Sequence, residues 1–275
     1  MDPFVSYLKD GKLPESDLEA RELKRRAQKF VQVNEELYKR SFTQPLLKCV
    51  RPREADYVLR EIHEGICGSH IRARTLYQKA LRQGYYWPTM VSDAEQLVKK
   101  CERCQRVSNL IHVPSAMLTH LVQPCYNGTQ FTDRTVKEWC QELGIKQHFT
   151  SVAHPQANGQ IELANRTMLH GLKARVDKAD KRWVDELPSI LWSYRTTMRG
   201  STGETPFNLC YGSEALIPVE IEIPTFRVDH FNLESNEQGL RNNLDTMEEL
   251  RDEARVRQAV YNQRIERYYN RRVKA

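Results

Sequence analysis

The chain has 275 residues, of which 40% are hydrophobic and 28% charged, and its formal net charge is +6. This composition is typical of a polar globular protein with one large domain or several small ones, and it argues against a disordered chain. No run approaches the roughly 20 apolar residues of a membrane span, and the N-terminal segment MDPFVSYLKDGKLPE lacks the apolar core of a signal peptide. We therefore expect no membrane partner.

The seven cysteines indicate the redox compartment of the protein, and the surplus of positive charge indicates the kind of partner it could bind. The cysteine count is odd, and the spacing follows no regular framework of secreted disulfides. We expect a reducing, intracellular compartment, in which cysteine pairs bind metals more often than they form disulfides. The 42 Lys and Arg against 36 Asp and Glu are compatible with a polyanionic partner such as nucleic acid.

The first half of the chain predicts short helices and one hairpin. Apolar residues recur at helical spacing after Ser16, which forms a capping-box pattern with Glu19, and the apolar pattern over residues 31–49 favours a short hairpin. The aromatic turn Tyr85-Tyr86-Trp87 is assigned to a hydrophobic core rather than to a platform that stacks bases. Further helices are predicted over residues 52–65, 71–83 and 89–103.

The second half predicts more helices and little sheet. Residues 105–125 have little periodicity and are interpreted as a linker. Alternation predicts one strand over residues 145–150, and residues 200–230 are rich in loops. The predicted helices cover residues 132–143, 160–177, 182–197 and 236–273, the last as one long helix or a pair.

The last predicted helix contains the most basic run of the chain. From Arg251 to Lys274 there are eight Lys and Arg against three Asp and Glu, with tyrosines between them. One interpretation is a surface that contacts DNA phosphates or pairs with another subunit. The other is a solvated helix beside an apolar stripe, and the sequence favours neither.

Four metal-ligating side chains stand at a characteristic spacing, His63-x6-His70-x30-Cys101-x2-Cys104. Two imidazoles and two thiolates form a tetrahedral zinc set. On one straight helix the two histidines would lie roughly 10 Å apart, so Gly65 and Gly68 must let the chain fold back between them. Cys67 is an alternative ligand, and the role of a small buried hydrophobe fits it better. Such a zinc is structural, because it stabilises a unit of about 50 residues with a small core of its own.

Several blocks resemble the integrase of a retroelement, most closely that of plant gypsy-type LTR retrotransposons. Residues 57–105, with YVLREIHEGICGSH, GYYWPTM and CERCQ, resemble its HHCC N-terminal domain. NGTQF at 127–131 and HPQANGQIE at 154–162 resemble the blocks around the later catalytic acids of the core. The segments WVDELPSILWSYRTT and TPFNLCYG resemble the end of that core. The resemblance implies a fragment of a Pol polyprotein that acts on DNA in the nucleus.

The resemblance also implies an RNase H-like core in which three acids hold two Mg²⁺ or Mn²⁺ ions for phosphoryl transfer. Glu162 matches the third acid, although without the resemblance it would be interpreted as a solvated acid at a helix start. Tyr126 occupies the place of the second acid, and a neutral phenol is a poor magnesium ligand. No Asp or Glu lies between Glu102 and Asp133, so the first acid is absent. We therefore expect no productive binding of Mg²⁺ or Mn²⁺.

Nucleic-acid contacts are assigned to both sides of Glu162 on the same resemblance. Gln156, Asn158 and Gly159 belong to the loop that precedes it. Arg166 and Lys173 follow by four and eleven residues, so they share the helical face of Glu162 and can reach phosphates.

The predicted fold class is α+β and mostly helical. A three-helix HHCC zinc-binding domain is followed by a truncated RNase H-like integrase core and a long C-terminal helix. We expect the helices of this core remnant to assemble loosely unless a partner supplies the strands on which they would pack, because the chain lacks those strands. The expected division is a helix and hairpin (1–50), the HHCC domain (51–106), a linker (107–125), the partial core (126–225) and a basic helical tail (226–275).

Three functions remain open. The first is an integrase-like protein that binds nucleic acid, is related to DNA integration by descent and has lost catalysis. The second is a zinc-dependent module that binds DNA or protein and associates with itself or with an intact integrase. The third is an incomplete gene model of an active integrase.

Overall fold

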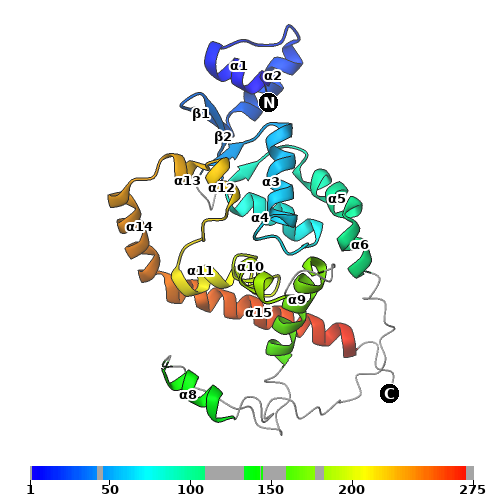
Figure 1. Ribbon diagram of the computed structural model, residues 1–275. Helices are drawn as coiled ribbons and strands as arrows, with labels where there is room; N and C mark the ends of the chain where they lie inside the picture. Colours follow the sequence, from blue (N-terminus) through cyan, green and yellow to red (C-terminus); the bar gives the residue numbers. More distant parts are fainter. Residues whose placement is uncertain are drawn as a thin grey trace.

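The computed structural model describes residues 2–41, 46–108, 133–142, 144, 159–176 and 183–270. Helices dominate these residues, and a small sheet lies toward the N-terminal end of the molecule (Figure 1). None of the described helices is both long and apolar enough to cross a membrane. The predicted strand over 145–150 and most of the predicted linker lie outside the described residues.

The N-terminal part consists of two helices and most of the sheet. Helix α2 starts after Ser16, but the Ser16 side chain makes no capping hydrogen bond, so the capping box is not formed. The predicted hairpin over residues 31–49 is confirmed in part. A tight two-residue turn at Asn34 and Glu35, with φ angles of 48° and 65°, joins β1 and β2, and residues 47–49 form a third strand. The elements are α1 (Asp2–Asp10), α2 (Asp17–Ala27), β1 (Phe30–Val33), β2 (Glu36–Lys39) and β3 (Leu47–Cys49).

A unit of four helices follows, and it contributes β4 (Tyr85–Tyr86), the fourth strand of the sheet. Strand β4 pairs in parallel with β3, while β1, β2 and β3 are antiparallel neighbours. Tyr85 and Trp87 are 0% and 3% exposed within the main hydrophobic core, which confirms their assignment to a core. The helices are α3 (Pro52–Glu64), α4 (Ala73–Arg82), α5 (Met90–Lys100) and α6 (Glu102–Ser108).

The predicted helix over residues 89–103 is divided in two. Cys101 has extended backbone angles (φ −72°, ψ 110°), so α5 ends at Lys100 and α6 begins at Glu102. This break turns the chain within the Cys-x2-Cys motif. The break between α5 and α6 therefore determines the positions of the Cys101 and Cys104 thiols.

The remaining described helices form the C-terminal half of the molecule. Residues 233–270 form a pair of helices, one of the two alternatives expected, and short helices occupy the loop-rich region before them. The helices are α8 (Arg134–Glu142), α9 (Gly159–Arg175), α10 (Trp183–Arg195), α11 (Pro206–Tyr211), α12 (Val219–Glu222), α13 (Phe226–Asp229), α14 (Leu233–Asp245) and α15 (Met247–Asn270).

Helices α9 to α12 are not loosely assembled, in contrast to the expectation. Helix α9 contacts both α10 and α6, and Ile217 and Val219 belong to the same core as α3, α4 and α5. The amine of Lys79 donates to the hydroxyls of Thr196 (2.9 Å) and Thr197 (3.3 Å) just beyond the end of α10. Burial lowers the pKa of Lys79 to about 8. The helices therefore have a packing surface, which α4 and α6 supply.

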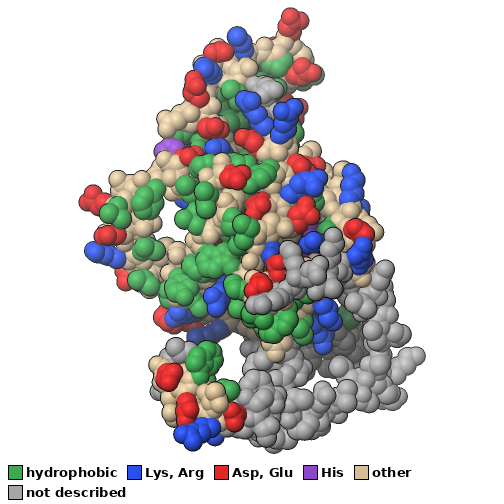
Figure 2. Space-filling model, viewed as in Figure 1, with side chains coloured by type: hydrophobic (Ala, Val, Ile, Leu, Met, Phe, Trp, Pro, Cys, Tyr) green, Lys and Arg blue, Asp and Glu red, His purple; other side chains and the backbone are tan. Residues whose placement is uncertain are grey.

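An exposed apolar face covers part of this C-terminal half. Figure 2 shows hydrophobic side chains gathered over the region of α11 to α14. Each of the main contributors is more than half exposed: Tyr211, Leu216, Ile221, Phe231, Leu233 and Leu244. Their grouping differs from the scattered single apolar residues of an ordinary protein surface.

Leu76 tests whether the core around α4 sustains the fold. Its side chain is 0% exposed, so replacing Leu76 by Ala leaves a cavity and lowers the free energy of unfolding by about 2 to 5 kcal/mol. The matched control is Leu18→Ala, because Leu18 is 79% exposed and its replacement costs little. Urea unfolding followed by circular dichroism measures both. Equal stabilities of the two variants would contradict the assignment of this core.

Candidate metal centre

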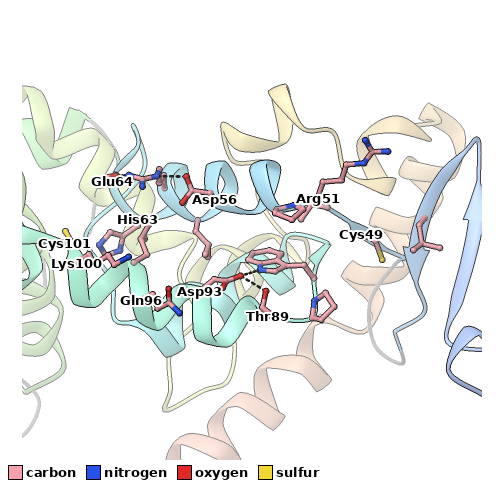
Figure 3. A pocket seen from close by; sticks show the side chains of 18 of the residues that line it. Cys49, Arg51, Asp56, His63, Glu64, Thr89, Asp93, Gln96, Lys100 and Cys101 are labelled. Atoms are coloured by element: carbon pink, nitrogen blue, oxygen red, sulfur yellow. Dashed lines mark hydrogen bonds and ion pairs between the residues drawn. The ribbon is translucent and has the colours of Figure 1, made fainter. Parts of the chain in front are cut away.

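The structure brings the four predicted metal ligands together. His63 lies in the last turn of α3, His70 follows a short loop, Cys101 stands at the break between α5 and α6, and Cys104 lies in α6. One donor atom from each side chain lies within 4.8 Å of the other three. Figure 3 shows His63 and Cys101 side by side at one end of the groove described below.

The distances between these donor atoms suit a tetrahedral zinc ion. Nε2 of His63 lies 3.2 Å from Sγ of Cys104, and Nδ1 of His70 lies 3.3 Å from Sγ of Cys101 and 3.9 Å from Sγ of Cys104. With Zn–N and Zn–S bonds of about 2.0 and 2.3 Å, the N–S edge of a tetrahedron is roughly 3.5 Å. The four side chains therefore fit zinc with little rearrangement.

The chain folds back between the two histidines at positions that only glycine fits. A Cβ on Gly68 would lie 2.5 Å from the carbonyl oxygen of His63, and one on Gly65 would lie 2.4 Å from that of Glu61. His70 has a φ of 51°, and its N–H donates to the carbonyl of His63 at 3.0 Å. The predicted fold-back at the two glycines is confirmed.

The electrostatics of the centre favour a metal ion. Burial lowers the pKa of both histidines to about 4, so they are neutral at pH 7, in the form that binds metals. Burial raises the pKa of Cys104 to about 12, so its thiol is protonated until a cation displaces the proton.

Cys67 does not belong to the group of four. It lies in the loop between the two histidines and is only half-buried, and burial raises the pKa of its thiol. The alternative in which Cys67 replaces one of the four ligands has no support in this geometry.

A groove of 1240 Å³ runs from the metal centre along α3 and α5 toward Cys49 in the sheet (Figure 3). Inside it, the indole N–H of Trp87 donates to Asp93 at 2.8 Å, and the hydroxyl of Thr89 donates to the same carboxylate oxygen at 2.7 Å. His63 and Cys101 line its end, so the groove ends beside the metal centre.

The residues assigned to catalysis are only partly described. Glu162 lies at the N-terminal end of α9, as predicted, but its side chain is outside the described residues, and so is Tyr126. Asp133 is exposed and precedes α8, and its carboxylate accepts a hydrogen bond from the N–H of Thr135.

Of the residues assigned to nucleic-acid contact, the structure likewise describes only some. Gln156 and Asn158 lie outside the described residues, and Gly159 begins α9. Arg166 and Lys173 are exposed on α9. Sequence reasoning missed Arg175 in the last turn of that helix, whose guanidinium reaches the loop between the two histidines. No pattern in the sequence distinguishes it from the other basic residues of α9.

Residues 50–109 match the family model described as the integrase zinc binding domain. The match includes all four ligands of the metal centre. The chain therefore contains an HHCC zinc-binding domain of the integrase type.

Three polyproteins have similar segments. The Pro-Pol polyprotein of Simian foamy virus type 1 is 29% identical over 91 residues, which are 33% of this chain and 8% of that protein. That of Simian foamy virus type 3 (strain LK3) is 27% identical over 106 residues, 37% of this chain and 9% of that protein. The transposon Tf2-3 polyprotein of Schizosaccharomyces pombe is 30% identical over 97 residues, 35% and 7% of the two chains. The chain matches less than a tenth of the length of these relatives.

Gly68→Ala tests the fold-back of the HHCC loop. The new Cβ collides with the backbone of His63, so we expect the loop to move and zinc to bind at least about tenfold more weakly. Competition with a chromophoric chelator measures the affinity. Gly200→Ala is the control, because a Cβ there meets nothing within 4 Å. An unchanged affinity of Gly68→Ala would show that the loop geometry does not govern zinc binding.

Proposed function

We propose that this chain is an integrase-like protein of a gypsy-type LTR retrotransposon, which binds duplex DNA through a zinc-stabilised HHCC domain and helix α9 but does not catalyse strand transfer. The HHCC match and the polyprotein relatives support the integrase-like part of this proposal. The observation that carries DNA binding is a group of cations beside the metal centre.

Exposed basic side chains from three parts of the chain lie near His70 and His170. Arg72 and Lys173 both lower the pKa of His170 in addition to its burial, and His170 and Arg103 act in the same direction on His70. Arg166, His170 and Lys173 follow one another on one face of α9. Helices α6 and α9 are in contact, so these residues form one surface, the basic arc: Arg72, Arg103, Arg166 and Lys173.

The basic arc is available to an anionic partner. All four cations are exposed, and none takes part in an ion pair within the described part of the chain. Clustered cations without acidic partners are typical of surfaces that bind the phosphates of nucleic acid. Their place beside the HHCC loop explains why zinc would support DNA binding, because the loop positions Arg72 and α6 positions Arg103.

Neutralising the basic arc tests this part of the proposal. In the triple variant Arg72→Gln, Arg103→Gln and Lys173→Gln, we expect weaker binding to duplex DNA. We also expect the slope of log affinity against log salt to be smaller by about 0.9 for each lost phosphate contact. Fluorescence anisotropy with a labelled duplex over a range of salt concentrations measures both quantities.

A matched control distinguishes the effect of the basic arc on DNA affinity from the effect of the net charge. Arg21→Gln, Lys24→Gln and Arg25→Gln remove the same charge from exposed positions of α2. If both triple variants lose affinity equally, DNA binding depends on overall charge and the assignment of the arc is wrong. The zinc content of each variant is measured first, because Arg103 lies between the two cysteine ligands.

The loss of catalysis follows from the acids that the sequence lacks. Two metal ions about 3.5 to 4 Å apart need several carboxylates to hold them in register. Glu162 is the one acid that matches the resemblance, with Tyr126 in the second place and no acid in the first. The RNase H-like origin of the residues around α9, a nuclear location, and a second copy or an intact integrase as protein partner belong to the same proposal.

A strand-transfer assay tests the catalytic part. We expect no joining of oligonucleotide 3′ ends to a target duplex in the presence of Mg²⁺ or Mn²⁺, because one carboxylate cannot place both ions. Products that disappear in a Glu162→Gln variant would show that the chain is catalytic. Products that persist in that variant point to a contaminating enzyme, and the expectation then stands.

A further inference from the structure

The guanidinium of Arg175 is buried against the loop that joins the two histidine ligands. Its Nε donates to the carbonyl of Gly68 at 2.8 Å, and its Nη2 donates to that of Ile66 at 2.7 Å and to that of Gly65. Its Nη1 donates to the carboxylate of Glu186 on α10 at 2.6 Å. The Arg175 and Glu186 side chains are 9% and 15% exposed.

These hydrogen bonds are made to the part of the loop where the backbone comes so close to itself that only glycine fits, at Gly65 and Gly68. Gly65 ends α3, and a helix leaves its last carbonyls without partners inside the helix. Arg175 supplies donors for this end and for the two carbonyls that follow within the fold-back. A planar guanidinium with five fixed N–H groups suits such a set, which the three donors of a lysine amine cannot reproduce.

A second contact holds the same loop from α10. The hydroxyls of Ser69 and Ser193 are hydrogen-bonded at 2.8 Å, and Ser69 immediately precedes His70. Helix α9 also comes close here, because a Cβ on Gly171 would lie 3.3 Å from that of Ser69. The loop is therefore held between the HHCC helices on one side and α9 and α10 on the other.

We propose that Arg175 is a positioning residue for zinc: it fixes the loop from Gly65 to Gly68, so that His63 and His70 face the two thiols before the metal arrives. Coupling between two binding events is reciprocal. Zinc in turn stabilises the packing of α9 and α10 on the HHCC domain, and with it the basic arc. This inference rests on the zinc binding of the proposed function.

The alternative is that Arg175 and Glu186 only join α9 to α10. An ion pair between two helices contributes to stability but leaves the affinity for zinc unchanged. The three carbonyl contacts distinguish the two cases, because they belong to the ligand loop and not to α10.

Zinc affinity of the full chain tests the proposal. We expect Arg175→Gln to bind zinc about tenfold more weakly, the usual effect of removing a residue that orients a metal ligand. We expect Arg175→Lys to bind zinc almost as weakly as Arg175→Gln, because lysine keeps the positive charge but lacks the planar guanidinium that donates to several carbonyls at once. Arg195→Gln is the control, since Arg195 is exposed at the end of α10. Competition with a chromophoric chelator gives the affinities.

Hydrogen exchange supplies a readout that a purely structural ion pair would not change. In the wild type and in Arg195→Gln, zinc should slow the exchange of amides in α9 and α10. In Arg175→Gln the rates in these helices should be the same with and without zinc.

The outcomes separate this inference from the proposed function. A wild type that binds no zinc refutes the zinc-stabilised function itself. A wild type that binds zinc, with an equal affinity in Arg175→Gln or no effect of zinc on α9 and α10, refutes the inference alone. If Arg175→Gln does not fold, Arg175→Lys decides by the same criteria.

Discussion

The turn between His63 and His70 is the constraint on which the rest of the structure depends. Each histidine is buried, and the pKa of each is lowered to about 4, so neither is stabilised by its own charge. Their positions are set by backbone contacts: Gly68 against the carbonyl of His63, and the N–H of His70 bonded to that carbonyl. A metal joins this turn to the break between α5 and α6, so the ends of three helices are fixed at one point.

Two cations of α4, Lys79 and Arg82, provide the second connection between the HHCC domain and the C-terminal segment. Lys79 donates to Thr196 and Thr197, and Arg82 pairs with Glu214 (2.5 Å) and with Glu204. Close by, Arg227 donates to Glu220 and to Gln83. Buried charges of this kind are costly unless they are paired, so the pairs of Arg82 and Arg227 favour one arrangement of the C-terminal segment. These contacts explain how the C-terminal segment packs on α4 in a defined way.

The sequence predicted those features whose determinants are local. The spacing of two histidines and two cysteines identified the metal centre, because a fold-back at Gly68 and a turn at Cys101 need only a few neighbouring residues. A hairpin over residues 31–49 was predicted from a local apolar pattern, but the position of its turn at Asn34 and Glu35 was not. The contacts of Arg175 join residues more than a hundred positions apart, and no periodicity encodes them. Packing of α9 and α10 on α4 and α6 was equally beyond a pattern-based prediction, which expected those helices to lack a partner.

The difference between local and distant determinants also explains why the zinc centre is complete while the two-metal centre of the catalytic acids, under the proposed function, is not. A structural zinc draws all its ligands from one compact unit, residues 63 to 104, so that unit can retain them whatever happens to the rest of the chain. A two-metal catalytic centre needs carboxylates from segments far apart in the sequence, and losing one segment removes the chemistry at once. Under the proposed function, the part that keeps its structure is the one whose folding is coupled to a bound ion. Helix α9, on which Glu162 lies, is joined to that part because Arg175 contacts the loop of the zinc ligands.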